Sequence, residues 1–410
     1  MKEQAQRAIE ECRRIAAMTE EPGRITRRFL TPPMHDVHAL LTARMQALGM
    51  AVHVDAAGNL RGLWQPAKGA TRRIILGSHV DTVPDAGAFD GVLGVTLALE
   101  WVAIAREINF PLAVELIAFS EEEGVRFGVP FIGSRAVAGR FDASLLALKD
   151  AEGVTVGESI CAFGLDLSGI ETSVADSSAL AFIEVHIEQG PVLEAENLSV
   201  AAVAAIVGQT RMSLTFTGHA NHAGTTPMHL RRDALAAAAE WIVAVEKIAK
   251  ESGGLVATVG KIESVPNAGN VVPGSASVSL DVRHADDSTR IATVDALLAQ
   301  ANAIAERRGL TLTSKRQMDQ PAVPMDERLT AILAESLEAS GFPGKRMPSG
   351  AGHDAMVMAA RVPTAMLFLR SPGGVSHHPD EAVREEDVKA SLHVAHKFLE
   401  RLATEFHKVG

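Results

Sequence analysis

The chain has 410 residues, 47% of them hydrophobic and 22% charged, with a formal net charge of −11. This length favours two domains over one core, and an acidic balance without a basic patch argues against nucleic-acid binding. The two cysteines, Cys12 and Cys161, form no Cys-x-x-Cys pair, so neither a thiolate zinc site nor a disulfide framework is expected, and a reducing cytoplasm fits.

Helical and strand patterns alternate through residues 1–207, which predicts a sheet flanked by helices. The first segment contains acids throughout and is interpreted as an amphipathic helix, not a signal peptide. No apolar run reaches the about 20 residues that a membrane span needs. Helices are predicted over about 3–18, 34–48 and 91–107, and strands over 51–54, 59–64, 73–78, 113–119 and 181–187.

The order of predicted helices and strands changes near Gly208. The next elements are predicted as a strand over 211–218, a helix over 231–252, strands over 255–264 and 275–284, a helix over 287–309 and a strand over 310–317. This βαββαβ order is typical of a ferredoxin-like domain.

The remaining chain predicts a helix over 326–340, a strand over 365–369 and a final helix over about 384–405. The simplest arrangement is an α/β catalytic domain made of residues 1–207 and 326–410. A smaller α+β domain, residues 208–325, is then inserted between its two parts.

An apolar run that ends at Ile74-Ile75-Leu76 leads directly into His79, with Asp81 and Asp90 following. In open α/β sheets, functional side chains gather where strands end. A neutral imidazole is a metal ligand, and Asp81 is well placed to accept its second N–H. The alternative is a core histidine beside a surface loop.

Three further polar sequences follow predicted strands or lie in them. Glu121, Glu122 and Glu123 follow the strand 113–119, and their mutual repulsion would be offset by a bound dication that leaves one glutamate free for acid–base work. The alternative is a solvated acidic loop. His186 lies in the strand pattern 181–187, and His377 and His378 lie in a turn-rich loop.

Nitrogen and carboxylate ligands without cysteine suit a catalytic Zn, Mn, Co or Ni site. Five or six such ligands with one shared carboxylate suit two ions. The sequence contains no G-x-S-x-G nucleophile elbow, no dinucleotide-binding fingerprint and no P-loop.

The inserted domain carries a second polar group. Arg283 is a natural bidentate partner for a carboxylate, and His222 and Asn270 are suited to donate to a carbonyl or a developing oxyanion. Turn, cap and surface salt-bridge roles are the alternatives for the same residues.

Together these sequences resemble the dinuclear-metal aminoacylase and carboxypeptidase G family, in its N-carbamoyl-L-amino acid hydrolase, β-ureidopropionase and allantoate amidohydrolase branch. The resemblance covers nearly the whole chain. It implies a three-layer catalytic domain with an inserted ferredoxin-like lid and dimerisation domain. The motifs that carry it are GSHVDTVPDAGAFDGVLG, FSEEEGVRFG, VHIEQGP, GHANHAGTTPM, NAGNVVPG, DVR, SGAGHDA and GVSHHPDE.

The resemblance implies that Asp90 bridges two divalent ions. His79 and His186 then share one metal-binding arrangement with Asp90, and a glutamate and a C-terminal histidine complete the other. Which histidine binds which ion stays open. Glu123 precedes the glycine and His377 follows the serine, as in the family, although the glutamate triplet leaves a shift of one residue open and His378 replaces the family's asparagine. The remaining implied roles are a general base (Glu122), a partner that orients His79 (Asp81), and substrate or site-lining residues (Gln189, His222, Asn270, Arg283 and His353), with His222 also stabilising the oxyanion.

The resemblance further implies a cytoplasmic homodimer that hydrolyses N-carbamoyl-L-amino acids to the amino acid, carbon dioxide and ammonia. Its lid would move between open and closed forms. Allantoate, β-ureidopropionate and N-acyl amino acids are alternative substrates. A metallo-aminopeptidase or carboxypeptidase and a non-catalytic carboxylate-binding protein are more remote alternatives.

Overall fold

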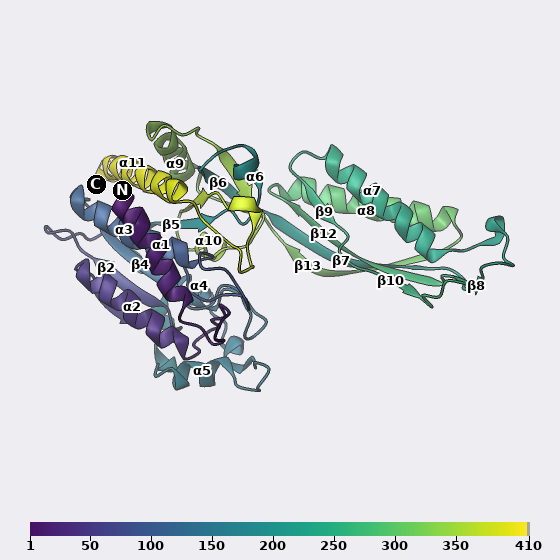
Figure 1. The fold of residues 1–410 in the computed structure, drawn as a ribbon, viewed down its shortest axis with the longest axis horizontal. Coiled ribbons are helices and arrows are strands. Elements are labelled where there is room, and N and C mark those ends of the chain that lie inside the picture. Colours follow the sequence, from purple (N-terminus) through teal and green to yellow (C-terminus); the bar gives the residue numbers. More distant parts are fainter. Residues whose placement is uncertain (408–410) are drawn as a thin grey trace. The chain divides into compact units, whose positions relative to one another are not determined.

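The computed structural model describes residues 1–407, which form two compact units (Figure 1). Within these residues, unit 1 comprises Met1–Ala204 and 325–407, and unit 2 comprises Ala205–Pro324. Each unit has a hydrophobic core of its own. None of the helices within residues 1–407 combines the length and apolarity required to cross a bilayer.

A nine-stranded mixed sheet organises unit 1, in the order β1-β2-β4-β3-β5-β16-β6-β14, with β15 beside β6. Its centre is parallel, because β3 pairs in parallel with β4 and β5, and β5 pairs in parallel with β16. The strands are β1 (Ala51–Val54), β2 (Leu60–Trp64), β3 (Arg73–His79), β4 (Ala113–Phe119), β5 (Ala179–Ile187), β6 (Val200–Ile206), β14 (Val323–Pro324), β15 (Arg346–Ser349) and β16 (Thr364–Leu369).

Helices cover both faces of this sheet, which gives the three layers that the sequence predicts. On one face, the first helix α1 packs against α3 and against the last helix α11, so helices from opposite ends of the sequence are neighbours (Figure 1). On the other face, α4 contacts α10, which packs against β5. The helices of unit 1 are α1 (Lys2–Ala16), α2 (Pro33–Ala47), α3 (Val92–Glu107), α4 (Ile132–Val137), α5 (Val156–Ala162), α6 (Val192–Ala195), α9 (Glu327–Ala339), α10 (Asp354–Met358) and α11 (Glu385–His407).

Unit 2 is an antiparallel sheet in the order β10-β12-β7-β13, with β9 also paired to β12 and two helices packed on it. Along the chain its main elements are β7 (Gly208–Thr217), α7 (Ala234–Glu251), β9 (Val256–Thr258), β10 (Ile262–Val265), β12 (Ser275–His284), α8 (Asp287–Arg307) and β13 (Thr311–Gln320). A short ribbon, β8 (Asn221–His222) paired with β11 (Val271–Val272), completes it. The single strand expected over 255–264 is divided into β9 and β10, with Gly260 in the gap between them.

Candidate active site

Four neighbouring parallel strands bring the polar residues of unit 1 to one edge of the sheet. His79 ends β3, the three glutamates follow β4, His186 lies near the end of β5, and the loop that contains His377 follows β16. Since β4, β3, β5 and β16 are adjacent and parallel, their carboxyl ends meet at the same edge. Asp90 lies in the loop between β3 and α3.

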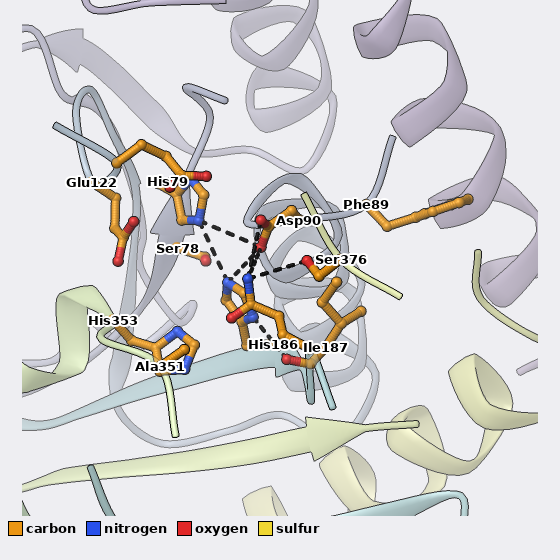
Figure 2. Close-up of polar contacts among 12 residues, drawn as sticks. Ser78, His79, Phe89, Asp90, Glu122, His186, Ile187, Ala351, His353 and Ser376 are labelled. Carbon is orange, nitrogen blue, oxygen red and sulfur yellow. Dashed lines mark hydrogen bonds and ion pairs between the residues drawn. The ribbon is translucent and has the colours of Figure 1, made fainter. Parts of the chain in front are cut away.

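His79, Asp90 and His186 form a buried group (Figure 2). The Nε2 atoms of the two histidines are 3.4 Å apart, and that of His186 is 3.4 Å from Asp90 Oδ1. The Nδ1 atoms point the other way. Nδ1 of His79 is 3.1 Å from the Asp81 carbonyl oxygen, and Nδ1 of His186 is 2.9 Å from the Ile187 carbonyl oxygen. Because a carbonyl only accepts, Nδ1 donates and each Nε2 lone pair faces Asp90. This donor set fits a divalent cation.

Asp90, Glu123 and His377 form a second group that shares Asp90 with the first. His377 Nε2 lies 3.1 Å from Asp90 Oδ2 and 3.6 Å from Glu123 Oε1. Glu123 Oε1 is buried without a hydrogen-bond partner among the described residues, which is expensive unless a cation or a proton compensates it. By contrast, the His378 side chain is exposed and its Nδ1 accepts the Asp380 N–H at 3.2 Å.

Asp81 joins the ends of β3 and β4. Its carboxylate lies 3.5 Å from His79 Nδ1, and it also accepts the backbone N–H groups of Glu122 at 3.0 Å and Glu123 at 3.1 Å. The hydrogen bond of His79 goes to the Asp81 carbonyl oxygen, so Asp81 orients the ring through its backbone as well as its side chain.

The electrostatics of the site are dominated by buried carboxylates. Burial, together with the neighbouring Glu123 carboxylate, raises the pKa of Glu122 well above its ordinary value. Burial with the nearby Asp90 carboxylate raises the pKa of Glu123 to about 7. Burial lowers the pKa of His186 to about 4, whereas its hydrogen bond to Asp90 raises the pKa of His377 to about 9. Such a concentration of negative charge favours a bound cation.

Gln189 and His353 also lie at this edge. The Gln189 side-chain amide donates to both Asp90 oxygens, at 3.0 and 3.1 Å, and to Ser376 Oγ at 3.2 Å. The His353 ring centroid is 4.4 Å from that of His186, and its Nε2 is 2.9 Å from Ser349 Oγ.

Sequence reasoning missed Glu184. It is fully buried, and it accepts Ser78 Oγ at 2.9 Å and the Ala355 N–H at 2.8 Å. With His186 and His353 it forms a further group of possible ligand atoms. The sequence signal that could have identified it is the position of this charged residue within the apolar run 181–187.

The three polar residues predicted in the inserted segment lie in unit 2, where His222 and Asn270 are neighbours and Arg283 lies apart from them. His222 pairs with Val271 in the β8–β11 ribbon, beside Asn270, whose carbonyl accepts the Ala223 N–H. This ribbon adjoins the Ser275 end of β12, since the Gly218 N–H bonds to the Gly274 carbonyl. Arg283 lies at the other end of β12, where its guanidinium contacts Asp281 at 3.0 Å. At the usual rise per residue, about 26 Å of strand separates these ends.

A parallel-centred α/β sheet with a carboxylate and imidazole site at its carboxyl edge is an architecture suited to metal-dependent catalysis. The family described as "Peptidase family M20/M25/M40" matches residues 75–401, and the chain belongs to this family. Together with the named relatives, this establishes a metal-dependent hydrolase of linear amides.

The two relatives reported below align with at least 93% of this chain and of their own length. The chain is 35% identical to an N-carbamoyl-L-amino acid amidohydrolase of Geobacillus stearothermophilus, over 98% of this chain and 99% of that protein. It is 36% identical to an allantoate amidohydrolase of Escherichia coli K12, over 93% of each. Among solved structures, a hydantoinase/carbamoylase family amidase from Burkholderia ambifaria superposes with a TM-score of 0.90 at 32% identity over 97% of both chains.

Proposed function

We propose that this protein hydrolyses N-carbamoyl-L-amino acids with two divalent ions per subunit. The observation that carries the proposal is the pair of ligand groups, His79–Asp90–His186 and Asp90–Glu123–His377, which share one carboxylate. The substrate class is supported by relatives named for it that align with 98% of this chain and 98–99% of their own length. Zinc and manganese are the proposed ions, and the cytoplasm is the proposed location.

The residues around the ligand groups supply the acid–base chemistry. When bound, two divalent ions polarise a carbonyl and lower the pKa of water toward neutrality. Glu122 lies beside this position, so its carboxylate takes a proton from the attacking water and passes it to the leaving nitrogen. Hydrolysis of the carbamoyl group consumes one water and yields the amino acid, carbon dioxide and ammonia. Asp81 holds the Glu122 backbone in place.

Unit 2 supplies the substrate contacts in this proposal. Arg283 binds the substrate carboxylate, and His222 with Asn270 binds the carbonyl and stabilises its oxyanion. The ribbon that contains His222 adjoins the Ser275 end of β12, and Arg283 lies near the other end, so one small substrate cannot touch both from the same copy. If both residues bind one substrate, the two contacts come from different copies, and the proposal therefore includes a homodimer in which unit 2 is both lid and dimerisation domain.

The test is ammonia release from N-carbamoyl-L-amino acids by protein loaded with Mn²⁺ or Zn²⁺. Glu122→Gln should lower kcat by at least about 10²-fold, because it removes the proton acceptor and keeps the side-chain shape. Metal content, measured by elemental analysis, should remain at the wild-type level. Retained activity in this variant would remove Glu122 as the base.

Allantoate is the second candidate substrate, because the Escherichia coli relative named for it is 36% identical. Allantoate also carries a carboxylate and ureido groups, so the same residues would serve. Comparison of the two substrates on one metal-loaded sample distinguishes these candidates.

A further inference from the structure

Glu381 lies outside the ligand groups but connects the loops that contain two of their members. It is 5% exposed. Its Oε1 accepts the backbone N–H groups of Phe89 at 3.0 Å and Asp90 at 2.9 Å, and its Oε2 accepts Ser376 Oγ at 2.9 Å. One carboxylate thus joins the loop after β3 to the loop after β16.

Gln189 closes these contacts into a ring. Its side-chain amide donates to the Asp90 carboxylate and to Ser376 Oγ, while its backbone N–H donates to Ser371 Oγ at 3.0 Å. The ring therefore runs from Asp90 through Gln189 and Ser376 to Glu381 and back to the Asp90 backbone. His377, next to Ser376, lies 3.1 Å from Asp90 across the ring.

The local backbone shows that this arrangement is imposed by its contacts. His377 has φ 56° and Gln189 has φ 57°. Residues other than glycine adopt this left-handed backbone conformation only at a cost in free energy. The facing loop is shaped for the carboxylate as well, since a Cβ on Gly87 would overlap Glu381, with its Cδ at 2.7 Å. Only glycine leaves room for Glu381 at this point.

We propose that Glu381 is a positioning residue, which sets the separation of Asp90 and His377 and so forms the second of the two cation subsites. This inference rests on the proposed two-ion function. The first subsite shares Asp90, but its other two members, His79 and His186, stand on β3 and β5 and have no contact with Glu381 among the hydrogen bonds described, so it depends less on Glu381. Loss of Glu381 should therefore weaken cation binding at the second subsite far more than at the first.

Titration of metal-free protein with Co²⁺ tests the proposal, with bound metal measured by equilibrium dialysis and ligand-field absorption. Wild type should bind two equivalents. Glu381→Ala should bind the first within about twofold of wild type and the second at least about 10-fold more weakly, the usual effect of losing a residue that supports metal ligands. Glu381→Gln should recover most of the loss, because its amide oxygen still accepts the Phe89 and Asp90 N–H groups.

Asp380→Ala is the matched control, because Asp380 is the preceding acidic residue of the same loop and its side chain is exposed. It should titrate as wild type. If Glu381→Ala does not fold, judged by the melting curve of the metal-free protein, Ser376→Ala breaks the same ring and should weaken the second equivalent in the same direction. If these variants bind both Co²⁺ ions with wild-type affinity, or if both affinities fall by the same factor, the proposed role of Glu381 would be overturned. Fewer than two equivalents in wild type would overturn the two-ion function itself.

Discussion

At the scale of single residues, Asp81 shows how one side chain can serve two strand ends. It lies beside His79 at the end of β3 and accepts the N–H groups of Glu122 and Glu123 after β4. Any shift of Asp81 would therefore move a proposed ligand and the proposed base together. The sequence predicts only the first of these contacts, because the second depends on the parallel pairing of β3 with β4.

His38 is a buried titratable residue outside the site. It is 6% exposed, neither ring nitrogen has a hydrogen-bond partner among the described residues, and its ring centroid lies 5.4 Å from that of Phe163. Burial, assisted by the charge of His35, lowers the pKa of His38 to about 4. The unfolded chain has the ordinary pKa of about 6.5 and binds the proton first, so the folded state is favoured fully above pH 6.5 and loses this stability as pH falls toward 4.

We expect His38→Leu to remove this pH dependence. Between pH 7.5 and 5.0 wild type should lose about 2 kcal/mol of unfolding free energy that the variant does not lose, from a pKa difference of about 2.5. Urea unfolding of both proteins at the two pH values measures the difference. His53→Gln, at an exposed position on β1, is the control and should behave as wild type. If wild type and His38→Leu lose the same unfolding free energy between these pH values, protonation of His38 does not destabilise the folded state.

Residues were predictable where a polar group interrupts or ends an apolar strand. His79, Asp90, Glu122, Glu123, His186 and His377 were all named from such positions or from the resemblance, and the structure brings them to one edge. Glu381 was within a recognised motif, yet its role was not predictable, because its partners Phe89 and Asp90 lie almost 300 positions away in the chain. Long-range hydrogen bonds of this kind leave no local pattern.

At the scale of elements, long periodic segments were predicted to within a few residues. Examples are α3, expected over 91–107 and observed as Val92–Glu107, and β4, expected and observed over 113–119. Among the elements that were missed are α10, which has only five residues, and β6. The run Val200–Ile206 contains only alanine, valine and isoleucine, so it shows neither helical nor alternating periodicity. It is a strand because it pairs with β16, β14 and β15, which are distant in the sequence.

At the scale of the whole molecule, the two ends of β12 lead to a prediction about assembly. Arg283→Ala and His222→Ala should each be nearly inactive, since each removes a contact to the charged or polar end of the substrate. If one site takes His222 from one copy and Arg283 from the other, a mixed dimer of the two variants contains one complete site.

Equal mixing with subunit exchange should therefore restore about a quarter of wild-type activity, because half of the dimers are mixed and each has one intact site. Ammonia release before and after mixing measures this recovery. The control is Arg283→Ala alone taken through the same exchange procedure, and its activity should not increase. No recovery after proven exchange would mean that each copy uses its own His222 and Arg283.

The most direct test of the proposed reaction is kcat/KM for ammonia release on one metal-loaded preparation, with N-carbamoyl-L-amino acids, allantoate and β-ureidopropionate as substrates, and with dipeptide cleavage measured beside them. We predict that an N-carbamoyl-L-amino acid is the best substrate and that dipeptides are not cleaved. Efficient dipeptide cleavage without ammonia release from any ureido substrate would contradict the account.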